Sequence, residues 1–240
     1  MDSPWYARAF GHDYLRVYSH RSTGQARAQV RAMLDCGLLP RAGRVLDIAC
    51  GAGRHLLEMR QAGLDAFGLD YSMELLRLCG LAGLAVRADM REMPFAEGTF
   101  DWASSLFTSF GYFKDAGEDC RMMRQAARVL RPGGRLVIDH INPAATLRDL
   151  QALSIEERDG MQITQRRRTE CGRIVKEVSV QDGDGSRQWT ESVILYDPAT
   201  LARLLAECGF GDLRRHGDLD GRPWNEADSP RQVVLARRLP

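Results

Sequence analysis

The pattern of apolar and polar positions over about the first 140 residues predicts short strands separated by helices. Apolar runs short enough for buried strands of a parallel sheet lie at 45–49, 64–69, 84–87, 100–106 and 135–140. Helical patterns fill the intervals. The helix that begins near Ala116 stops at a Pro-Gly-Gly turn (132–134), which excludes its continuation. Such alternation is typical of an α/β fold with a largely parallel sheet.

The pattern changes after Asn142, where consecutive extended runs replace the alternation. The runs at 161–169, 173–181 and 187–196 are separated by glycine-containing turns that suit β hairpins. Asp197-Pro198 then starts a helix that reaches about Cys208, and strands are expected at about 212–218 and 232–238. We therefore expect an antiparallel meander outside the main sheet, inserted before the last helix.

Aromatic residues mark the N-terminal segment. Within residues 4–19 they lie near helical spacing and form a narrow stripe. The stripe consists of Trp5, Phe10, Tyr14 and Tyr18. A second helix is expected from about Ser22 to about Cys36, with Gly37 at its end. Because so much aromatic area must be covered, this segment is expected to pack over the mouth of a site.

Composition limits the classes of protein. The chain has 240 residues, 44% of them hydrophobic, which suits one α/β domain with an insertion. Its formal net charge is +1, from 33 basic and 32 acidic residues, so no nucleic-acid partner is expected. No apolar run approaches the ~20 residues of a membrane span, and no export leader is recognisable. The six cysteines lack a C-x-x-C pair and metal-ligand spacing, which predicts reduced, mostly buried thiols, no metal and a cytoplasmic location.

The strongest chemical signal is a glycine turn between the strand at 45–49 and a helix that begins after Arg54. Gly51 and Gly53 permit a tight turn and close approach of the backbone to a ligand. Open α/β sheets bind ligands at this end of their strands. A dinucleotide site needs a third glycine where this chain has Leu56, so pyrophosphate binding is disfavoured.

Acidic residues accompany the turn. Asp47 lies inside the strand, four residues before Gly51. Asp70 ends the second strand, 23 residues after Asp47, where a carboxylate can accept both hydroxyls of a ribose. Asp89 follows the third strand. Asp70 and Asp89 are expected to bracket a nucleoside without phosphates, and the alternative for each is a helix cap.

Together these signals resemble the class I S-adenosylmethionine-dependent methyltransferases. The resemblance covers about residues 40–142 and rests, in family order, on Asp47-x-x-x-Gly51-x-Gly53, Gly68-Leu69-Asp70, Ala88-Asp89-Met90 and Leu130-Arg131-Pro132-Gly133-Gly134. It implies a Rossmann-like seven-stranded sheet with helices on both faces. It also implies one domain, composed of an N-terminal helical lid (1–38), a cofactor-binding core (40–142), the inserted β meander (143–196) and a C-terminal helix and strands (197–240).

The resemblance further implies S-adenosyl-L-methionine as cofactor and S-adenosyl-L-homocysteine as product. The Asp47 turn is expected to face the methionine part, Asp70 the ribose and Asp89 the adenine amino group. Arg21 is expected to pair with the methionine carboxylate. The predicted cofactor-binding residues are Asp47, Ala49, Gly51, Gly53, Asp70, Tyr71, Asp89, Met90, Tyr14 and Arg21. Ala49 departs from the family pattern, which often has a glycine there.

The sequence gives weaker signals for the site that binds the methyl acceptor. The aromatic loop 107–113 follows the fourth strand, where the family places its acceptor, and Tyr112 within it is a candidate catalytic residue; core packing is the alternative. His140 is a candidate general base, because a histidine pKa lies near neutrality. A buried structural histidine is the alternative, and Asp139 is a second candidate base. The run 166–168, three arginines, alternates across a strand and predicts a solvated edge.

The predicted function is methyl transfer to a small-molecule acceptor, at N, O or C, by in-line displacement that relies on positioning and desolvation. The alternatives are a methyltransferase acting on protein or RNA, a nicotinamide-dependent oxidoreductase, and a nucleoside-binding module without chemistry. Residues 104–107 read Ser-Ser-Leu-Phe, not the Pro-Pro-aromatic sequence of the family's nucleic-acid amine enzymes. By analogy alone, the meander is expected to cover the acceptor pocket or to form a homodimer interface.

Overall fold

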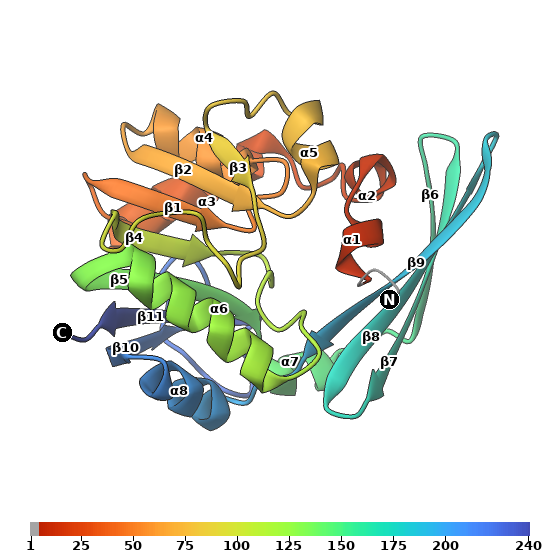
Figure 1. The fold of residues 1–240 in the computed structure, drawn as a ribbon. Helices are drawn as coiled ribbons and strands as arrows, with labels where there is room; N and C mark the ends of the chain where they lie inside the picture. Colours follow the sequence, from red (N-terminus) through yellow and green to blue (C-terminus); the bar gives the residue numbers. More distant parts are fainter. Residues whose placement is uncertain (1–4) are drawn as a thin grey trace.

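A seven-stranded sheet forms the centre of the molecule (Figure 1). The computed structural model describes residues 5–240, except for the side chains of residues 7 and 8. The strands of this sheet are β1 Arg44–Ile48, β2 Asp65–Asp70, β3 Ala85–Arg87, β4 Phe100–Ser105, β5 Leu130–Ile141, β10 Phe210–His216 and β11 Arg231–Arg238. Their order is β10-β11-β5-β4-β1-β2-β3. The strands from β5 to β3 pair in parallel, and β11 is antiparallel to both of its neighbours, which confirms the predicted Rossmann-like sheet.

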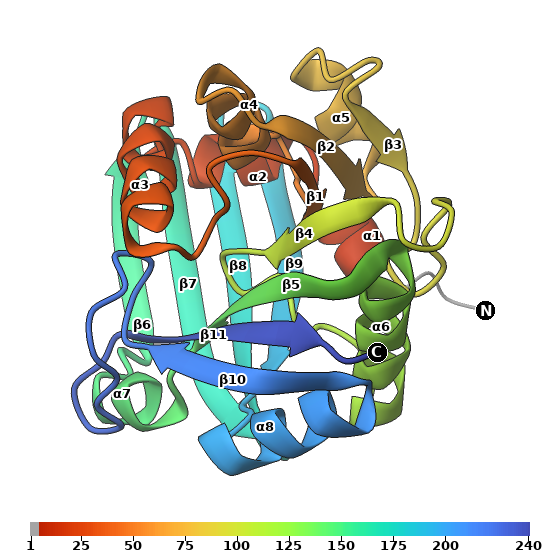
Figure 2. The ribbon, with the colours of Figure 1, turned by 90° about the vertical axis from the view of Figure 1, so that its left-hand side faces the viewer.

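Helices cover both faces of this sheet, as predicted (Figure 2). The helices are α1 Tyr6–Ala9, α2 His12–Val17, α3 Thr23–Cys36, α4 Arg54–Gln61, α5 Met73–Leu78, α6 Ala116–Val129, α7 Pro143–Arg148 and α8 Pro198–Glu207. One face packs against α3, α4 and α5, and the other against α6 and α8. Several helices begin at an N-cap residue whose side chain accepts a hydrogen bond from a backbone N–H of the first turn. These N-cap residues are Ser22, Ser72, Asp115, Asn142 and Asp197.

A separate four-stranded antiparallel sheet, which we call the meander, stands beside the main sheet (Figure 1). Its strands are β6 Leu153–Arg158, β7 Met161–Glu170, β8 Arg173–Asp182 and β9 Gly185–Ile194, paired in chain order. The predicted meander is confirmed, but β6 was missed. That strand is short and acidic, and its apolar residues point outward: Leu153 is 48% and Ile155 59% exposed.

The meander is fixed to the N-terminal helices through an apolar patch of its own. Val17 and Tyr18, at the end of α2, belong to a buried cluster with meander residues. The meander residues of this cluster are Met161, Ile163, Val178 and Val180. The Tyr18 hydroxyl also donates to Glu191 Oε1 at 2.9 Å. As a result α1 and α2 lie between the main sheet and the meander (Figure 1).

The N-terminal aromatic segment, expected to be one helix, forms two. The chain breaks at Gly11 because it passes close to α5: a Cβ on Gly11 would lie 2.6 Å from Glu74 Oε2. The N–H of His12 donates to Glu74 Oε1 at 2.8 Å and so starts α2. The second expected helix, from Ser22 to Cys36, is confirmed as α3.

The cysteines are free thiols, as expected, but they are not mostly buried. Cys120 and Cys208 are buried, whereas Cys36 and Cys171 are exposed. Among the described residues no cluster of His, Cys, Asp and Glu has the arrangement of a metal site. No helix within residues 5–240 is both long enough and apolar enough to cross a membrane.

Candidate active site

A cavity of about 430 Å³, which we call the turn cavity, lies over the glycine turn after β1. Ala49, Gly51 and Gly53 have left-handed backbones, with φ of 57°, 54° and 71°. Ala49 therefore adopts, at a cost of about 1 kcal/mol, a conformation that a glycine adopts freely. Ala49 and Gly51 line the cavity. Gly53 instead allows close packing, because a Cβ there would lie 2.6 Å from Leu81 Cδ1.

Asp70 braces this turn. Its Oδ2 accepts the N–H of Gly51 at 2.7 Å, and its Oδ1 accepts the N–H of Ser72 at 2.8 Å. The N-cap of α5 is Ser72, so the alternative of Asp70 as a helix cap is wrong. Burial raises the pKa of Asp70 despite these bonds. Each carboxylate oxygen can accept one further hydrogen bond, which is what the predicted ribose contact requires.

Asp47 lies at the floor of the turn cavity and is 3% exposed. Its Oδ1 accepts a hydrogen bond from Ser104 Oγ at 3.3 Å. Burial raises the pKa of Asp47 to about 7; the Ser104 hydrogen bond opposes this shift and the Asp70 carboxylate adds to it. A cation in the turn cavity would stabilise the ionised carboxylate and reverse the shift.

Two arginines face the turn cavity without a carboxylate partner among the described residues. Arg54, the first residue of α4, lies 3.9 Å from the centroid of the Phe107 ring, and its buried Nη2 has no hydrogen-bond partner within the described chain. Arg21 lies 4.0 Å from the centroid of the Tyr18 ring and donates to the Tyr14 hydroxyl at 2.9 Å. Burial, followed by repulsion from Arg21, lowers the pKa of Arg54 to about 10. The pair suits a ligand carboxylate. Arg54 was missed, although its position directly after the glycine turn was a usable signal.

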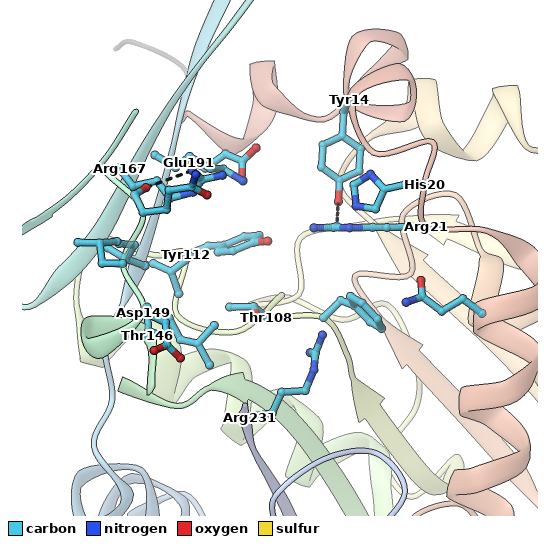
Figure 3. Close-up of a pocket in the computed structure, with 18 residues that line it drawn as sticks. Tyr14, His20, Arg21, Thr108, Tyr112, Thr146, Asp149, Arg167, Glu191 and Arg231 are labelled. Atoms are coloured by element: carbon cyan, nitrogen blue, oxygen red, sulfur yellow. Dashed lines mark hydrogen bonds and ion pairs between the residues drawn. The ribbon is translucent and has the colours of Figure 1, made fainter. Parts of the chain in front are cut away.

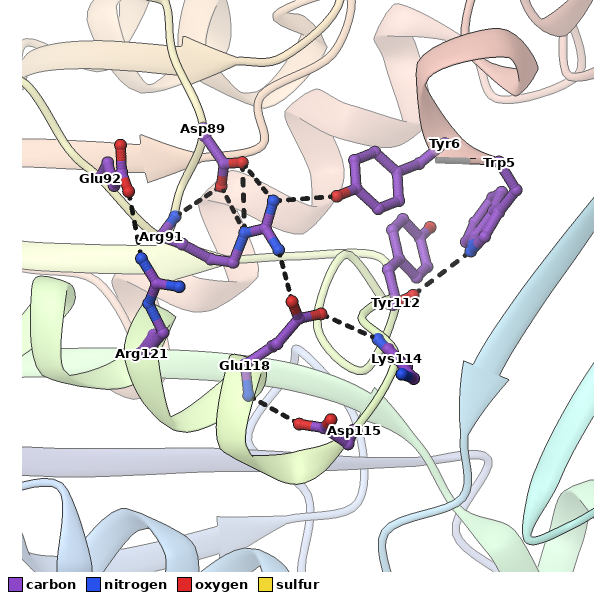
Figure 4. Close-up of polar contacts among 10 residues, drawn as sticks. All are labelled: Trp5, Tyr6, Asp89, Arg91, Glu92, Tyr112, Lys114, Asp115, Glu118 and Arg121. Carbon is purple, nitrogen blue, oxygen red and sulfur yellow. Dashed lines mark hydrogen bonds and ion pairs between the residues drawn. The ribbon is translucent and has the colours of Figure 1, made fainter. Parts of the chain in front are cut away.

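Asp89 lines a small hollow and does not line the turn cavity. Its carboxylate forms an ion pair with Arg91 (Figure 4). Arg91 Nη2 lies 2.6 Å from Asp89 Oδ2, and the backbone N–H of Arg91 donates to Oδ1 at 2.8 Å. Burial acts to raise the pKa of Asp89, but the Arg91 hydrogen bonds outweigh it and lower the pKa. Arg91 also contacts Glu118 at 2.9 Å and the Tyr6 hydroxyl at 3.2 Å, so α1 is tied to this network.

The small hollow has a volume of about 50 Å³, room for about one or two water molecules. Met90 and Tyr71 line it, and Tyr6 closes it with edge-on contacts to Tyr71 and Phe113. No helix follows Asp89, so its alternative role as a cap is wrong. With Tyr6 in this position the hollow is too small for a purine.

A larger cavity of about 650 Å³, which we call the meander cavity, lies between the turn cavity and the meander. Tyr14, His20 and Arg21 project into it from the N-terminal side (Figure 3). Glu191 faces it from the meander, and Arg231 points toward it from β11. Its volume lies within the range of small-molecule sites.

The two cavities share a wall. The side chains that line both are Tyr14, Arg21, Phe107 and Tyr112. Tyr112 extends toward the space between them (Figure 3). Burial raises the pKa of Tyr112 well above its usual value, so the phenol is neutral near pH 7. Tyr112 can therefore exchange a hydrogen bond with a ligand at the junction, while its catalytic role stays a prediction.

A strained corner positions Phe107 in this wall. Phe107 and Thr108 have left-handed backbones, with φ of 55° and 61°. Asp139, which is fully buried, accepts the N–H of Phe107 at 2.8 Å through Oδ2 and that of Thr108 at 3.1 Å through its carbonyl. Arg231 Nη1 in turn contacts the two oxygens of Asp139 at 2.9 and 2.7 Å. Asp139 is thus committed to this corner, which does not support it as a general base.

His140 lies outside both cavities. Its ring is fully buried and packs against Phe110 and Tyr196, each at a centroid distance of 5.9 Å. Burial lowers the pKa of His140 to about 4. A proton acceptor for the reaction must reach the substrate, so the structure favours the alternative of a buried structural histidine. Position at the end of β5 was not enough to place the side chain at the crevice.

A row of charged residues crosses the meander and faces the meander cavity. Arg167, Lys176 and Glu191 are paired in register across β7, β8 and β9, and all line the cavity. Lys176 Nζ lies 2.6 Å from Glu191 Oε2. Arg166 and Arg168 are exposed on the opposite face of β7, an internal strand. The predicted solvated edge is therefore wrong for Arg167.

A family model described as a methyltransferase domain matches residues 45–134, the segment that carries the glycine turn, Asp70 and Asp89. This match supports the class I S-adenosylmethionine-dependent methyltransferase family that the sequence motifs predict. The match gives no support to the alternative function of a nicotinamide-dependent oxidoreductase.

Relatives and solved structures agree with this family. The chain is 27% identical over 213 residues to the ubiquinone/menaquinone biosynthesis C-methyltransferase UbiE of Klebsiella pneumoniae, covering 81% of this chain and 77% of that protein. It is 34% identical over 125 residues to the demethylmenaquinone methyltransferase of Renibacterium salmoninarum, covering 49% of each, so it spans about half the length of that relative. The CcbJ methyltransferase of Streptomyces caelestis has the same fold, with a TM-score of 0.81, 20% identity and 100% coverage of both chains.

S-adenosylmethionine, the cofactor of the family, fits the residues around the turn cavity. Arg21 and Arg54, which have no carboxylate partner among the described residues, offer their guanidiniums to a carboxylate. The free acceptor capacity of Asp70 suits hydroxyl groups, and the buried Asp47 suits a cation. S-adenosylmethionine as the cofactor is therefore confirmed, whereas the role of each residue in binding it stays a prediction.

Proposed function

We propose that the protein transfers a methyl group from S-adenosylmethionine, held in the turn cavity, to a small-molecule acceptor held in the meander cavity. The observation that supports this proposal is the shared wall, because two ligands on its two sides would meet at Tyr112 and Phe107. The named pathway of the relative UbiE, quinone biosynthesis, is also small-molecule chemistry.

Catalysis in this arrangement rests on positioning and exclusion of water. S-adenosylmethionine would supply an electrophilic methyl group. A lone pair of the acceptor would form the new bond to the methyl carbon, and the sulfur would keep the electron pair of the broken bond. Tyr112, a neutral phenol at the junction, orients the acceptor atom through a hydrogen bond. Phe107 fixes the approach between the two ligands. Tyr14 and Tyr18, held against the meander by α2, exclude water from above.

A protein or RNA acceptor has less support. The meander cavity is covered on one side by α2 and on the other by the meander, which are joined by the Tyr18–Glu191 hydrogen bond of 2.9 Å. This enclosed cavity presents no flat surface on which a folded protein or an RNA duplex could dock and place its target atom. The near-neutral charge of the chain also gives no basis for phosphate binding.

A methyl-transfer screen tests the proposal. The purified protein is incubated with S-adenosylmethionine and small amines, phenols and carboxylic acids, and release of S-adenosylhomocysteine is measured. Total RNA and a denatured protein extract serve as parallel acceptors. We expect turnover with a subset of the small molecules. Turnover confined to the macromolecular samples, or absence of S-adenosylhomocysteine binding by calorimetry, would contradict the proposal.

A further inference from the structure

We propose that the methyl acceptor carries a carboxylate and that Arg167 binds it in the meander cavity. This inference rests on the proposed function, because it takes the meander cavity as the acceptor site. It concerns the middle residue of the arginine run 166–168, which the sequence assigns to a solvated edge and the structure turns toward the cavity.

Arg167 has no counter-ion among the described residues. Its Nη1 donates to Ser154 Oγ at 3.1 Å and to the Gln151 carbonyl at 3.3 Å, and its Nη2 donates to the Gln165 side chain. These acceptors are uncharged and hold the guanidinium in place without neutralising it. No carboxylate lies within ion-pair distance of Arg167 among the described residues. Its positive charge is therefore available to a ligand in the cavity.

The second argument compares the cations around the two cavities. Arg231 is paired with Asp139 at 2.7 Å, and Lys176 with Glu191 at 2.6 Å. Among the arginines that line either cavity, three have no carboxylate partner in the described chain; these are Arg21, Arg54 and Arg167. S-adenosylmethionine brings one carboxylate, and Arg21 and Arg54 both line the turn cavity where it would bind. Of these three, Arg21 lines both cavities, whereas Arg167 lines the meander cavity only, so we assign the anion that pairs with Arg167 to the acceptor.

The third argument concerns the shape of the anion and the surface beside it. A guanidinium already held by several hydrogen bonds presents its remaining N–H groups in a fixed plane, which suits a planar carboxylate. In the next row on the same face of the meander, the apolar side chains of Ile174 and Val193 line the same cavity. The geometry thus points to an acceptor with an apolar body and a carboxylate at one end.

The neighbouring arginine supplies a matched control. Arg166 lies on the same strand, is exposed on the opposite face and, like Arg167, has no ion-pair partner among the described residues. Arg166→Gln and Arg167→Gln therefore remove the same charge from adjacent positions of β7. Only the second variant removes it from the meander cavity.

The test is calorimetry on protein saturated with S-adenosylhomocysteine, with benzoate as the probe and benzamide and phenyl phosphate as comparisons. We expect benzoate to bind at least about tenfold more tightly than benzamide, and Arg167→Gln to weaken benzoate by at least about tenfold. Arg166→Gln should leave benzoate binding unchanged, and both variants should keep the wild-type affinity for S-adenosylhomocysteine. In the methyl-transfer screen, free acids should react faster than their methyl esters, and Arg167→Gln should remove this preference.

Several results would overturn the inference. These are no binding of benzoate to wild type, equal binding of benzoate and benzamide, unchanged benzoate affinity in Arg167→Gln, or tighter binding of phenyl phosphate, which would identify a phosphate site. Each can occur while S-adenosylhomocysteine binds and neutral acceptors are methylated, so the proposed function would stand. Loss of S-adenosylhomocysteine binding in wild type would instead refute the proposed function.

Discussion

Replacement of Asp139 by asparagine should impair methyl transfer through the corner at Phe107, without touching either ligand. The carboxylate accepts the Phe107 N–H at 2.8 Å and two contacts from Arg231 at 2.9 and 2.7 Å. Asparagine has nearly the same side-chain volume but only one acceptor oxygen. Either the Phe107 N–H or the Arg231 guanidinium must therefore face the NH₂ group of the new side chain. We expect the corner to relax and the Phe107 ring to leave the wall between the cavities.

The magnitude follows from burial. Asp139 is 0% exposed and the Arg231 side chain 25% exposed, and loss of one partner from a buried pair costs about 3–5 kcal/mol. Arg231 also contacts a second carboxylate, Asp218, at 3.7 Å. Release of two left-handed residues returns about 1 kcal/mol each. The free energy of unfolding should therefore fall by about 1–3 kcal/mol, and kcat/KM by at least about tenfold.

A second aspartate provides the control. Asp101 accepts the N–H of Arg44 at 2.7 Å and pairs with Arg131 at 2.8 Å, at the start of β4 and far from the cavities. Because the Arg131 side chain is 64% exposed, Asp101→Asn should cost at most about 1 kcal/mol and leave cofactor affinity and turnover unchanged. Urea unfolding, calorimetry with S-adenosylhomocysteine and steady-state kinetics measure these quantities. Asp139→Asn that loses stability but keeps wild-type turnover would refute the argument that the corner positions the site.

Further predictions concern the cofactor side. Because burial raises the pKa of Asp47 to about 7, this carboxyl is about half protonated at pH 7, and binding of the cationic cofactor should release about half a proton. Calorimetry in two buffers of different ionisation enthalpy measures this release, which should be absent in Asp47→Asn. The native state also holds this proton more tightly than the unfolded chain, so stability should fall as the pH rises from about 4 to about 7, less so in Asp47→Asn. Asp70→Ala should lower S-adenosylhomocysteine affinity at least about tenfold while the protein stays folded; unchanged affinity would leave Asp70 only a brace for the turn. Deletion of residues 1–21 should lower cofactor affinity and abolish turnover, and should raise binding of an apolar dye to the uncovered meander; a truncated protein with wild-type affinity would show that the N-terminal helices are not a lid.

The parts of the fold that the sequence predicted are those fixed by local physics. The strand at 45–49 and the turn after it depend on an apolar run and on glycines, which act within a few residues. The helix α8 begins where Asp197 accepts backbone N–H groups and Pro198 follows, a signal within one turn. The seven-stranded sheet with helices on both faces also followed from the family resemblance.

The parts that failed depend on contacts between distant segments. The break at Gly11 is caused by Glu74, more than one helix away along the chain. Arg167 alternates with Arg166 in any strand, but the sequence does not reveal which face of β7 meets a cavity. His140 and Asp139 both end β5, and only packing shows that one is enclosed by aromatic rings while the other holds a corner.

The same distant contacts join the two halves of the candidate site. The small hollow beside Asp89, of about 50 Å³, is closed by Tyr6 of α1, so a purine would enter it only after Tyr6 moves. The chain from α1 continues through Gly11 into α2, whose Tyr18 is hydrogen-bonded to Glu191 on the meander at 2.9 Å. Glu191 and Lys176 are wall residues of the meander cavity and neighbours of Arg167 in one row. We therefore expect a shift of α1 to reach the wall of the meander cavity through α2 and its Tyr18–Glu191 hydrogen bond.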